Sequence, residues 1–220
     1  EGTQKMMING GHHGREWVSS LLTMKKLETY ADAYEKNKKI GNYDIRYLAD
    51  RIAFVFVPMT NPDGVEISIH GPTIKQANYF RQIHGKNLNW HVWKANAIGI
   101  DPNKNYNYLY EKDTSKPDIQ GYTGKGAETA VETKAMADDV RKNQYCYTIS
   151  YHSSGQIIYW YVNQRGTRKS SDLQYVKAVA KETGYRIIQP GSENSYKMGY
   201  TDYIVGKLKK PAITIEVAPS

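Results

Sequence analysis

The sequence predicts an α/β fold, a mixed and largely parallel twisted sheet flanked by helices on both faces. Three observations support this prediction. Strand-like and helix-like segments alternate along the chain, several strand-like segments are apolar on both faces, and neither repeats nor low-complexity segments interrupt them. With 220 residues the chain can bury one good core, so we expect a single domain over 1–220.

Strands are predicted where apolar residues run continuously and a turn sequence follows. The clearest segment is 51–59, which contains the apolar sequence IAFVFV and precedes the turn sequence NPDG. Such a run is typical of a buried central strand. The other predicted strands are 5–8, 145–151, 157–162, 185–188 and 212–217.

Helices are predicted where apolar residues recur at helical spacing. In segment 16–34, Trp17, Leu21, Met24 and Leu27 follow this spacing, which indicates an amphipathic helix that covers the sheet. Segments 128–140 and 171–183 predict two more helices. Segment 70–113 has weak periodicity and many Asn, Gly and Tyr residues, so we expect a long irregular excursion there. Long loops in compact domains usually carry function.

The amino-acid composition indicates which classes of partner the protein can bind. The formal net charge of +8 would suit an anionic partner, but the lysines are scattered, as on an ordinary solvated surface. The sequence contains neither an aromatic and basic platform for nucleic acid nor an apolar run that could span a bilayer. Cys146 has no second cysteine with which to form an intramolecular disulfide. We expect no nucleic-acid partner, no membrane span and a monomer.

A candidate metal motif follows the first predicted strand. The sequence GGHHGREW places an imidazole and a carboxylate three residues apart, at His13 and Glu16, with His12 as a competing histidine. Catalytic zinc takes three nitrogen or oxygen ligands from the protein and keeps a fourth position open. His152, which follows the predicted strand 145–151, is the candidate third ligand because ligand-binding residues gather at the carboxyl ends of parallel strands.

Glu216 is a candidate general base. It lies within the strand-like sequence AITIEV, where a carboxylate costs solvation free energy unless it has a role. A carboxylate can take a proton from a metal-bound water, whose pKa the metal has already lowered. The sequence therefore predicts hydrolytic metal chemistry.

The order of these motifs resembles that of the zinc carboxypeptidase family of metallopeptidases. The landmarks are HxxE at 13–16, TNPDG at 60–64, GIDPNKN at 99–105, HS at 152–153 and TIE at 214–216, and the resemblance covers about residues 5–217. More narrowly, the sequences VPMTNPDGV and WKANA are similar to the bacterial branch that cleaves γ-D-glutamyl-diamino acid bonds in peptidoglycan stem peptides. The resemblance also implies N-terminal family strands that precede Glu1.

The resemblance implies one zinc ion per chain, bound by His13, Glu16 and His152. It also implies that Asp101 orients His13, since metal-bound imidazoles commonly donate their second N–H to a carboxylate. The implied reaction is hydrolysis of a peptide amide bond by a metal-activated water, with Glu216 as general base. We expect a γ-D-glutamyl-diamino acid bond of a cell-wall stem peptide as the substrate, and an extracellular or wall-associated protein.

The substrate-binding residues depart from the family pattern. Asn103 and Lys104 occupy the family's Asn-Arg pair, which binds the free carboxylate of the substrate. A second family arginine polarises the scissile carbonyl, and Lys94 is its nearest cationic substitute here. Ile98 stands where the bacterial relatives carry a further arginine. Lysine lacks the planar guanidinium fork, so two-pronged binding of a carboxylate is lost.

Three further positions follow from the resemblance. The family has a mobile tyrosine that covers the substrate, and Tyr196 and Tyr200 are the candidates for it. Thr201 corresponds to the floor of the specificity pocket, where a small neutral residue disfavours a strongly basic-specific pocket.

Alternatives to the endopeptidase remain open. One is an ordinary C-terminal carboxypeptidase. Another is a relative that keeps zinc and binds peptides without cleaving them, because the usual arginines are absent. A related zinc deacylase is disfavoured by the NPDG and IE landmarks. A turnover assay beside a zinc titration distinguishes a catalytic protein from a non-catalytic one.

Overall fold

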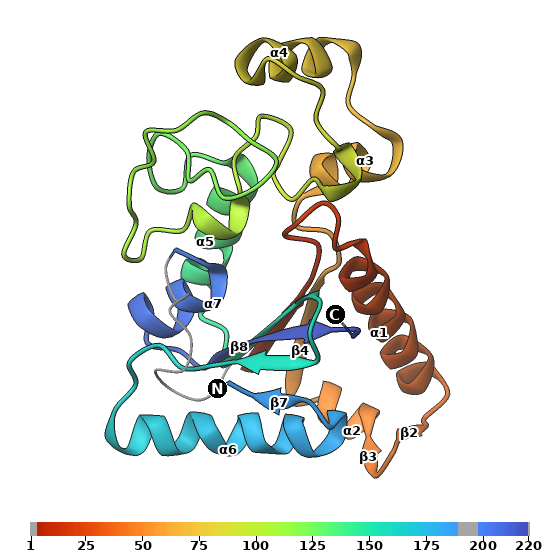
Figure 1. Cartoon of the computed structure of the whole chain (residues 1–220). Helices are drawn as coiled ribbons and strands as arrows, with labels where there is room; N and C mark the ends of the chain where they lie inside the picture. The colour runs from red at the N-terminus through yellow and green to blue at the C-terminus, as the bar shows by residue number, and fades with distance from the viewer. Residues whose placement is uncertain (1–3, 189–197, 220) are drawn as a thin grey trace.

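The computed structural model describes residues 4–188 and 198–219. Within these residues, six strands form one sheet in the order β4-β1-β5-β8-β6-β7 (Figure 1). β4, β1, β5 and β8 are parallel, β6 is antiparallel to β8, and β7 is parallel to β6. The strands are β1 Gln4–Asn9, β4 Ile52–Val57, β5 Tyr147–Ser153, β6 Ile157–Tyr159, β7 Arg186–Ile187 and β8 Ala212–Val217. The predicted mixed, largely parallel sheet is confirmed.

Helices connect most of these strands. They are α1 Trp17–Glu35, α2 Ile45–Ala49, α3 Pro62–His70, α4 Ile74–His84, α5 Val131–Asn143, α6 Gly166–Thr183 and α7 Tyr200–Asp202. Two short 3-10 turns, η1 Trp90–Val92 and η2 Pro102–Lys104, and a π-helical turn, η3 Tyr203–Lys207, accompany them. A small hairpin of β2 Lys39–Ile40 and β3 Tyr43–Asp44 lies between α1 and α2. Among the described residues, no helix is both long and apolar enough to cross a membrane.

Neighbouring residues of β1 point to opposite faces of the sheet, as strand geometry requires. Met7 packs with Tyr200, Tyr203 and residues of α5. Ile8 packs with Ile213 and with residues of α1 and α6. Figure 1 shows α1 and α6 on one side of the sheet and α5 and α7 on the other. The two apolar cores therefore explain why β1 and β8 carry apolar residues on both faces.

The segment 70–113 is more regular than its sequence predicts, because α4 occupies part of it. This helix begins with a capping box in which Thr73 and Gln76 bond each other's backbone N–H, and it ends at Gly85 with φ +68°. Ile74, Ala77, Phe80 and Ile83 recur at helical spacing along α4, and Phe80 and Ile83 pack in one apolar cluster with Trp93. The expectation of a wholly irregular excursion is therefore wrong, and the sequence T-x-x-Q was the signal for the helix.

The carboxyl ends of β1, β5 and β8 meet at one edge of the sheet. Asn9 lies opposite Ser150, and His152 lies opposite Glu216 in the parallel register. β1 leads directly into the loop 10–16 that carries the HxxE motif. Parallel pairing thus brings three segments distant in sequence to the same place.

Candidate metal centre

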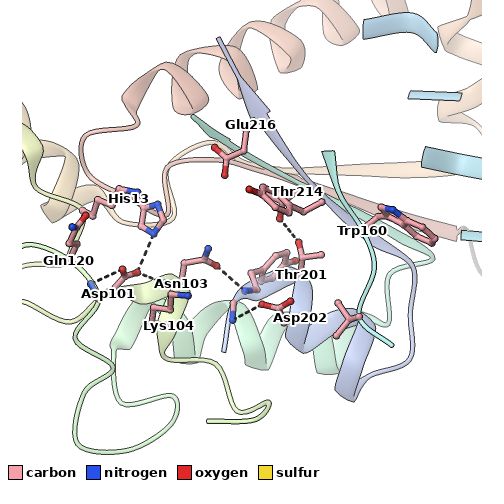
Figure 2. A pocket seen from close by; sticks show the side chains of 16 residues that line it. His13, Asp101, Asn103, Lys104, Gln120, Trp160, Thr201, Asp202, Thr214 and Glu216 are labelled. Atoms are coloured by element: carbon pink, nitrogen blue, oxygen red, sulfur yellow. Dashed lines mark hydrogen bonds and ion pairs between the residues drawn. The ribbon is translucent and has the colours of Figure 1, made fainter. Parts of the chain in front are cut away.

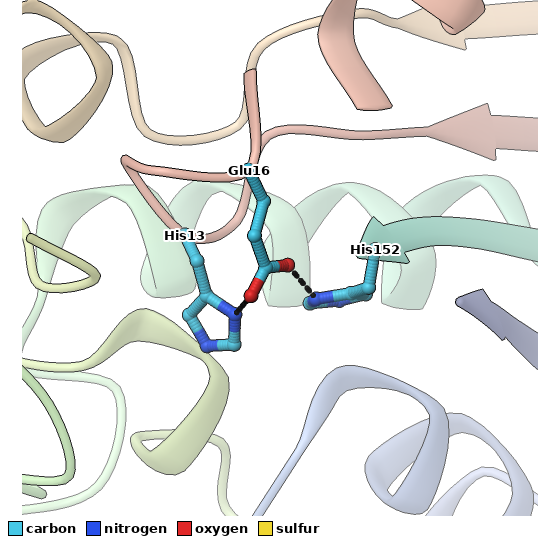
Figure 3. Close-up of side chains that lie close together, drawn as sticks. All are labelled: His13, Glu16 and His152. Atoms are coloured by element: carbon cyan, nitrogen blue, oxygen red, sulfur yellow. Dashed lines mark hydrogen bonds and ion pairs between the residues drawn. The ribbon is translucent and has the colours of Figure 1, made fainter. Parts of the chain in front are cut away.

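His13, Glu16 and His152 form a buried cluster at this edge (Figure 3). His13 Nδ1 lies 2.8 Å from Glu16 Oε1, and His152 Nδ1 lies 2.9 Å from Glu16 Oε2. One potential ligand atom from each residue lies within 4.8 Å of those of the other two. The structure therefore brings together the three residues that the sequence analysis selected as metal ligands.

Two glycines shape the loop that carries His13 and Glu16. Gly11 has φ +67°, a left-handed conformation that favours glycine. A Cβ on Gly14 would overlap the carbonyl of Gly64, so only glycine lets the loop approach α3 this closely. The Gly14 N–H donates to the Lys94 carbonyl at 3.2 Å, which ties the loop to the WKANA segment.

The Asn61 side chain holds the same loop in place through hydrogen bonds. Its Nδ2 donates to the carbonyls of His12 at 3.1 Å and Ala95 at 3.0 Å, and its Oδ1 accepts from the N–H of Gly64 at 3.0 Å. The side chain is fully buried. The NPDG landmark is therefore a structural support that joins the HxxE loop to the WKANA segment.

His12 lies beside the cluster but makes different contacts. Its Nε2 lies 3.0 Å from the Tyr106 hydroxyl, and its ring stacks on that of His152 at a centroid distance of 5.4 Å. His13 is the histidine of this pair whose ring nitrogen lies against Glu16. The local geometry thus distinguishes the two histidines that compete in the sequence.

Asp101 lies on the far side of the His13 ring. Its Oδ1 is 3.1 Å from His13 Nε2 and accepts the Asn103 N–H, and its Oδ2 accepts the Gly121 N–H. Burial opposes ionisation, but His13 and the hydrogen bonds lower the pKa of Asp101 to about 2. The ionised carboxylate accepts a hydrogen bond from Nε2–H, which directs the lone pair of Nδ1 toward the cluster.

The electrostatics of the cluster favour a cation. Burial alone would lower the pKa of His13, but Glu16 and Asp101 raise it to about 10. Burial alone would raise the pKa of Glu16, but His13 and His152 hold it well below its usual range. The site stabilises positive charge even though it is buried. Two imidazoles and one carboxylate are also a common donor set of catalytic zinc, so the residues present fit a zinc ion.

Glu216 and Lys94 flank the cluster. Burial raises the pKa of Glu216, and the neighbouring His152 partly counters this effect. Lys94 Nζ lies 3.1 Å from Glu16 Oε1 with its side chain mostly buried. Both side chains line the same cavity as His13, so the structure places both predicted catalytic groups beside the candidate metal ligands.

This cavity has a volume of about 540 Å³ (Figure 2). Asn103 and Lys104 line it from η2, and Thr201 lines it from α7. Asn103 Oδ1 accepts the Tyr200 N–H at 2.9 Å, and the hydroxyls of Thr201 and Thr214 share a hydrogen bond of 2.7 Å. The predicted substrate-binding residues Asn103, Lys104 and Thr201 therefore border one space with Glu216.

The two candidate tyrosines are placed differently. Tyr196 lies outside the described residues. Tyr200 is fully buried, packs in the core with Met7 and Tyr106, and donates its hydroxyl to the Met7 sulfur at 3.0 Å. Tyr200 also borders the cavity, so the structure places it in the wall of the site, and its covering role stays a prediction.

Sequence reasoning missed Asp202 as a site residue. Its carboxyl lines the cavity although the residue is only 9% exposed, and burial raises its pKa to about 6. A signal was present, because Asp202 is an acidic residue within the otherwise largely apolar sequence YTDYIV, and a buried carboxylate is costly without a partner.

Comparisons with known proteins agree with this geometry. The sequence model of a family described as zinc carboxypeptidase matches residues 1–212. A γ-D-glutamyl-L-diamino acid endopeptidase 1 from Lysinibacillus sphaericus is 28% identical over 222 residues, which cover 98% of this chain and 55% of that protein. The chain thus spans about half the length of this curated relative.

Solved structures share the fold. Thrombin activatable fibrinolysis inhibitor is similar with a TM-score of 0.69 and 21% identity, over 98% of this chain and 54% of that one. A murein-tripeptide amidase from Escherichia coli O157 is similar with a TM-score of 0.59 and 16% identity, over 100% of this chain and 74% of that one. At these identities the likeness concerns the fold.

Proposed function

We propose that this chain, which belongs to the zinc carboxypeptidase family, hydrolyses an amide bond in a peptide that carries a free carboxylate. The bond proposed is the one between a γ-D-glutamyl group and a diamino acid in a peptidoglycan stem peptide. The name of the relative from Lysinibacillus sphaericus supports this choice. The observation that carries the proposal is the buried cluster of His13, Glu16 and His152 beside a cavity that also contains Glu216 and Lys104.

In the proposed mechanism, His13, Glu16 and His152 hold one zinc ion. When bound, zinc supplies a Lewis acid and lowers the pKa of a coordinated water toward neutrality. Glu216 accepts the proton of the attacking water on its carboxylate and passes it to the leaving nitrogen. Burial raises the pKa of Glu216, so this carboxylate is a stronger base than an exposed glutamate. The Lys94 ammonium supplies positive charge where the carbonyl oxygen becomes negative.

Asn103 and Lys104 bind the carboxylate of the substrate in this proposal. The Asn103 side chain uses Oδ1 to accept the Tyr200 N–H, which leaves its Nδ2 group to donate to a carboxylate. Among the described residues, the Lys104 ammonium forms no ion pair, although it borders the cavity. Its charge is therefore available to a ligand, as a point charge without the fork of an arginine.

The test is a peptide panel analysed by mass spectrometry. It contains L-Ala-γ-D-Glu-diaminopimelate, an α-linked peptide with a free C-terminus, and amidated forms of both. Cleavage between glutamate and the diamino acid is expected with zinc-loaded protein, and loss of cleavage is expected with Glu216→Gln. Glu28→Gln, an exposed position on α1, is the matched control.

Other outcomes of the panel identify the alternatives. Release of C-terminal residues from α-linked peptides alone would make the protein an ordinary carboxypeptidase. Full zinc loading without any cleavage would favour the non-catalytic peptide-binding relative, which the absent arginines support. Either result would contradict the proposed reaction.

We also propose that the protein acts outside the cell or at the cell wall, where such peptides occur. A formal net charge of +8 supports this location, because it favours association with an anionic wall. Fractionation of cells that express the natural protein tests the proposal. Recovery in the cytoplasm alone would contradict it.

A further inference from the structure

Asp202 and Asp101 are two buried carboxylates that line the same cavity but differ in their partners. Asp101 faces the His13 ring and accepts two backbone N–H groups. Asp202 accepts one hydrogen bond within the described part of the chain, from the Gly199 N–H to Oδ2 at 3.1 Å, and it forms no ion pair there. A carboxylate has about four acceptor positions, so the described residues leave most of those on Asp202 unused.

The difference in partners appears in the acidity of the two groups. Burial raises the pKa of Asp202 to about 6, because the Gly199 N–H and the nearby charge of Lys104 compensate it only in part. The pKa of Asp101 lies at about 2 although that group is also buried, because His13 lies beside it. Among residues 4–188 and 198–219, no cation lies within hydrogen-bonding distance of Asp202.

The surroundings of Asp202 leave room for such a cation in the ligand. Lys104 acts on the carboxyl through its charge but is not paired with it. Thr201 and Thr214, which border the same part of the cavity, hydrogen bond to each other and carry no charge. Figure 2 shows Asp202 beside Thr201, across from Lys104 and Asn103. Within the described residues, the cavity is therefore lined by an ammonium without an ion pair and by a carboxylate with a single hydrogen bond.

We propose that Asp202 binds the second amino group of a diamino acid residue whose free carboxylate is held by Lys104 and Asn103. A ligand with one ammonium and one carboxylate matches the two opposite charges of the cavity. An ammonium offers three donors, which suits the free acceptor positions of Asp202. The inference rests on the proposed function for the position of the carboxylate, and it assigns to Asp202 the choice of a diamino acid over a neutral one.

Two matched peptides test this inference. γ-D-Glu-L-lysine and γ-D-Glu-L-norleucine have the same linkage, the same carboxylate and the same number of side-chain carbons, and they differ in the terminal ammonium. We expect zinc-loaded wild-type protein to prefer the lysine peptide by about ten- to a hundredfold in kcat/KM, the scale of one charged hydrogen bond. In Asp202→Asn this ratio should fall close to one. Because the ratio is taken within each variant, a general loss of activity cancels.

Asp50→Asn is the matched control, since Asp50 is exposed at the end of α2 and its replacement removes the same charge. It should keep the wild-type ratio. A third peptide with Nε-acetyl-lysine should behave like the norleucine peptide in wild-type protein. Equal kcat/KM for lysine and norleucine peptides in wild-type protein would overturn the inference, as would a preference that survives in Asp202→Asn.

An α-linked pair, L-Ala-L-lysine and L-Ala-L-norleucine, separates this inference from the proposed function. If only the α-linked pair is cleaved, with a lysine preference that Asp202→Asn removes, the γ-glutamyl proposal fails and the role of Asp202 stands. If the γ-linked pair is cleaved without preference for lysine, the γ-glutamyl proposal stands and the role of Asp202 fails. If neither pair is cleaved, calorimetric titration of zinc-loaded protein with free L-lysine and free L-norleucine decides. Equal affinities would reject the role of Asp202.

Discussion

Replacing Asp202 with asparagine should change how the stability of the protein depends on pH. Burial raises the pKa of this carboxyl to about 6, from an ordinary value of 3.8. The folded chain therefore binds the proton more tightly than the unfolded chain between about pH 4 and pH 6. Because Asp202 binds fewer protons in the unfolded state in this window, its contribution to the free energy of unfolding of the wild-type protein falls as pH rises through it.

The magnitude follows from the size of the pKa difference. A difference of about two pKa units corresponds to about 3 kcal/mol when the carboxyl is fully ionised in both states. Asparagine keeps an oxygen that can accept the Gly199 N–H and does not ionise. The stability of Asp202→Asn relative to wild type should therefore increase by about 2 to 3 kcal/mol from pH 4 to pH 7.

Urea unfolding of the two zinc-loaded proteins at several pH values measures this difference. Protonation of the metal site affects both proteins alike, so it largely cancels when the two curves are subtracted. Asp50→Asn shows how much of the change comes from net charge alone. A difference between Asp202→Asn and wild type that stays constant with pH would refute the reasoning, because Asp202 would then be hydrated or already paired.

Substitutions at three other positions test the site directly. His152→Ala should strip the zinc, since it removes one of three ligands, and full zinc occupancy by elemental analysis would refute the assignment. Glu216→Gln should retain zinc and lower turnover about a hundred- to ten-thousandfold, so activity within a few-fold of wild type would identify another base. Lys104→Ala should weaken the binding of peptides with a free carboxylate by about 1 to 3 kcal/mol. Lys104→Arg should keep or improve their binding. Amidated peptides should bind the two variants about equally. Equal losses for free and amidated peptides in a binding titration would leave the carboxylate-binding group unidentified.

The parts of the site that depend on local sequence could be predicted. HxxE places His13 and Glu16 on one short loop, and the apolar runs before His152 and around Glu216 indicate strands. Which strands pair is a property of the whole sheet. The position of His152 opposite Glu216 follows from the register of β5 and β8, and the family pattern anticipated that proximity where periodicity alone could not.

The errors have physical reasons as well. α4 carries both a capping box and apolar residues at helical spacing, but it is only 11 residues long within a segment rich in Asn, Gly and Tyr, so the composition of the whole segment concealed it. The contact between the Tyr200 hydroxyl and the Met7 sulfur is likewise invisible in the sequence, because neither composition nor spacing shows it. Asp202 was overlooked because the sequence does not show which of the two carboxylates, Asp101 or Asp202, has few hydrogen-bond partners. That property depends on the contacts of the folded chain.

Lys94 and Lys104, which the family resemblance aligns with arginines, hold their charges in different ways. Lys94 is paired with Glu16 Oε1 at 3.1 Å, whereas Lys104 forms no ion pair among the described residues. Glu16 is also a candidate metal ligand, so a metal ion held by Glu16 would compete with Lys94 for the same carboxylate. Like charges repel strongly in a buried site, so such an ion would weaken the Lys94–Glu16 pair. Because Lys94 also lines the cavity, its ammonium would then be available there as a point charge for a carbonyl oxygen, without the fork of an arginine.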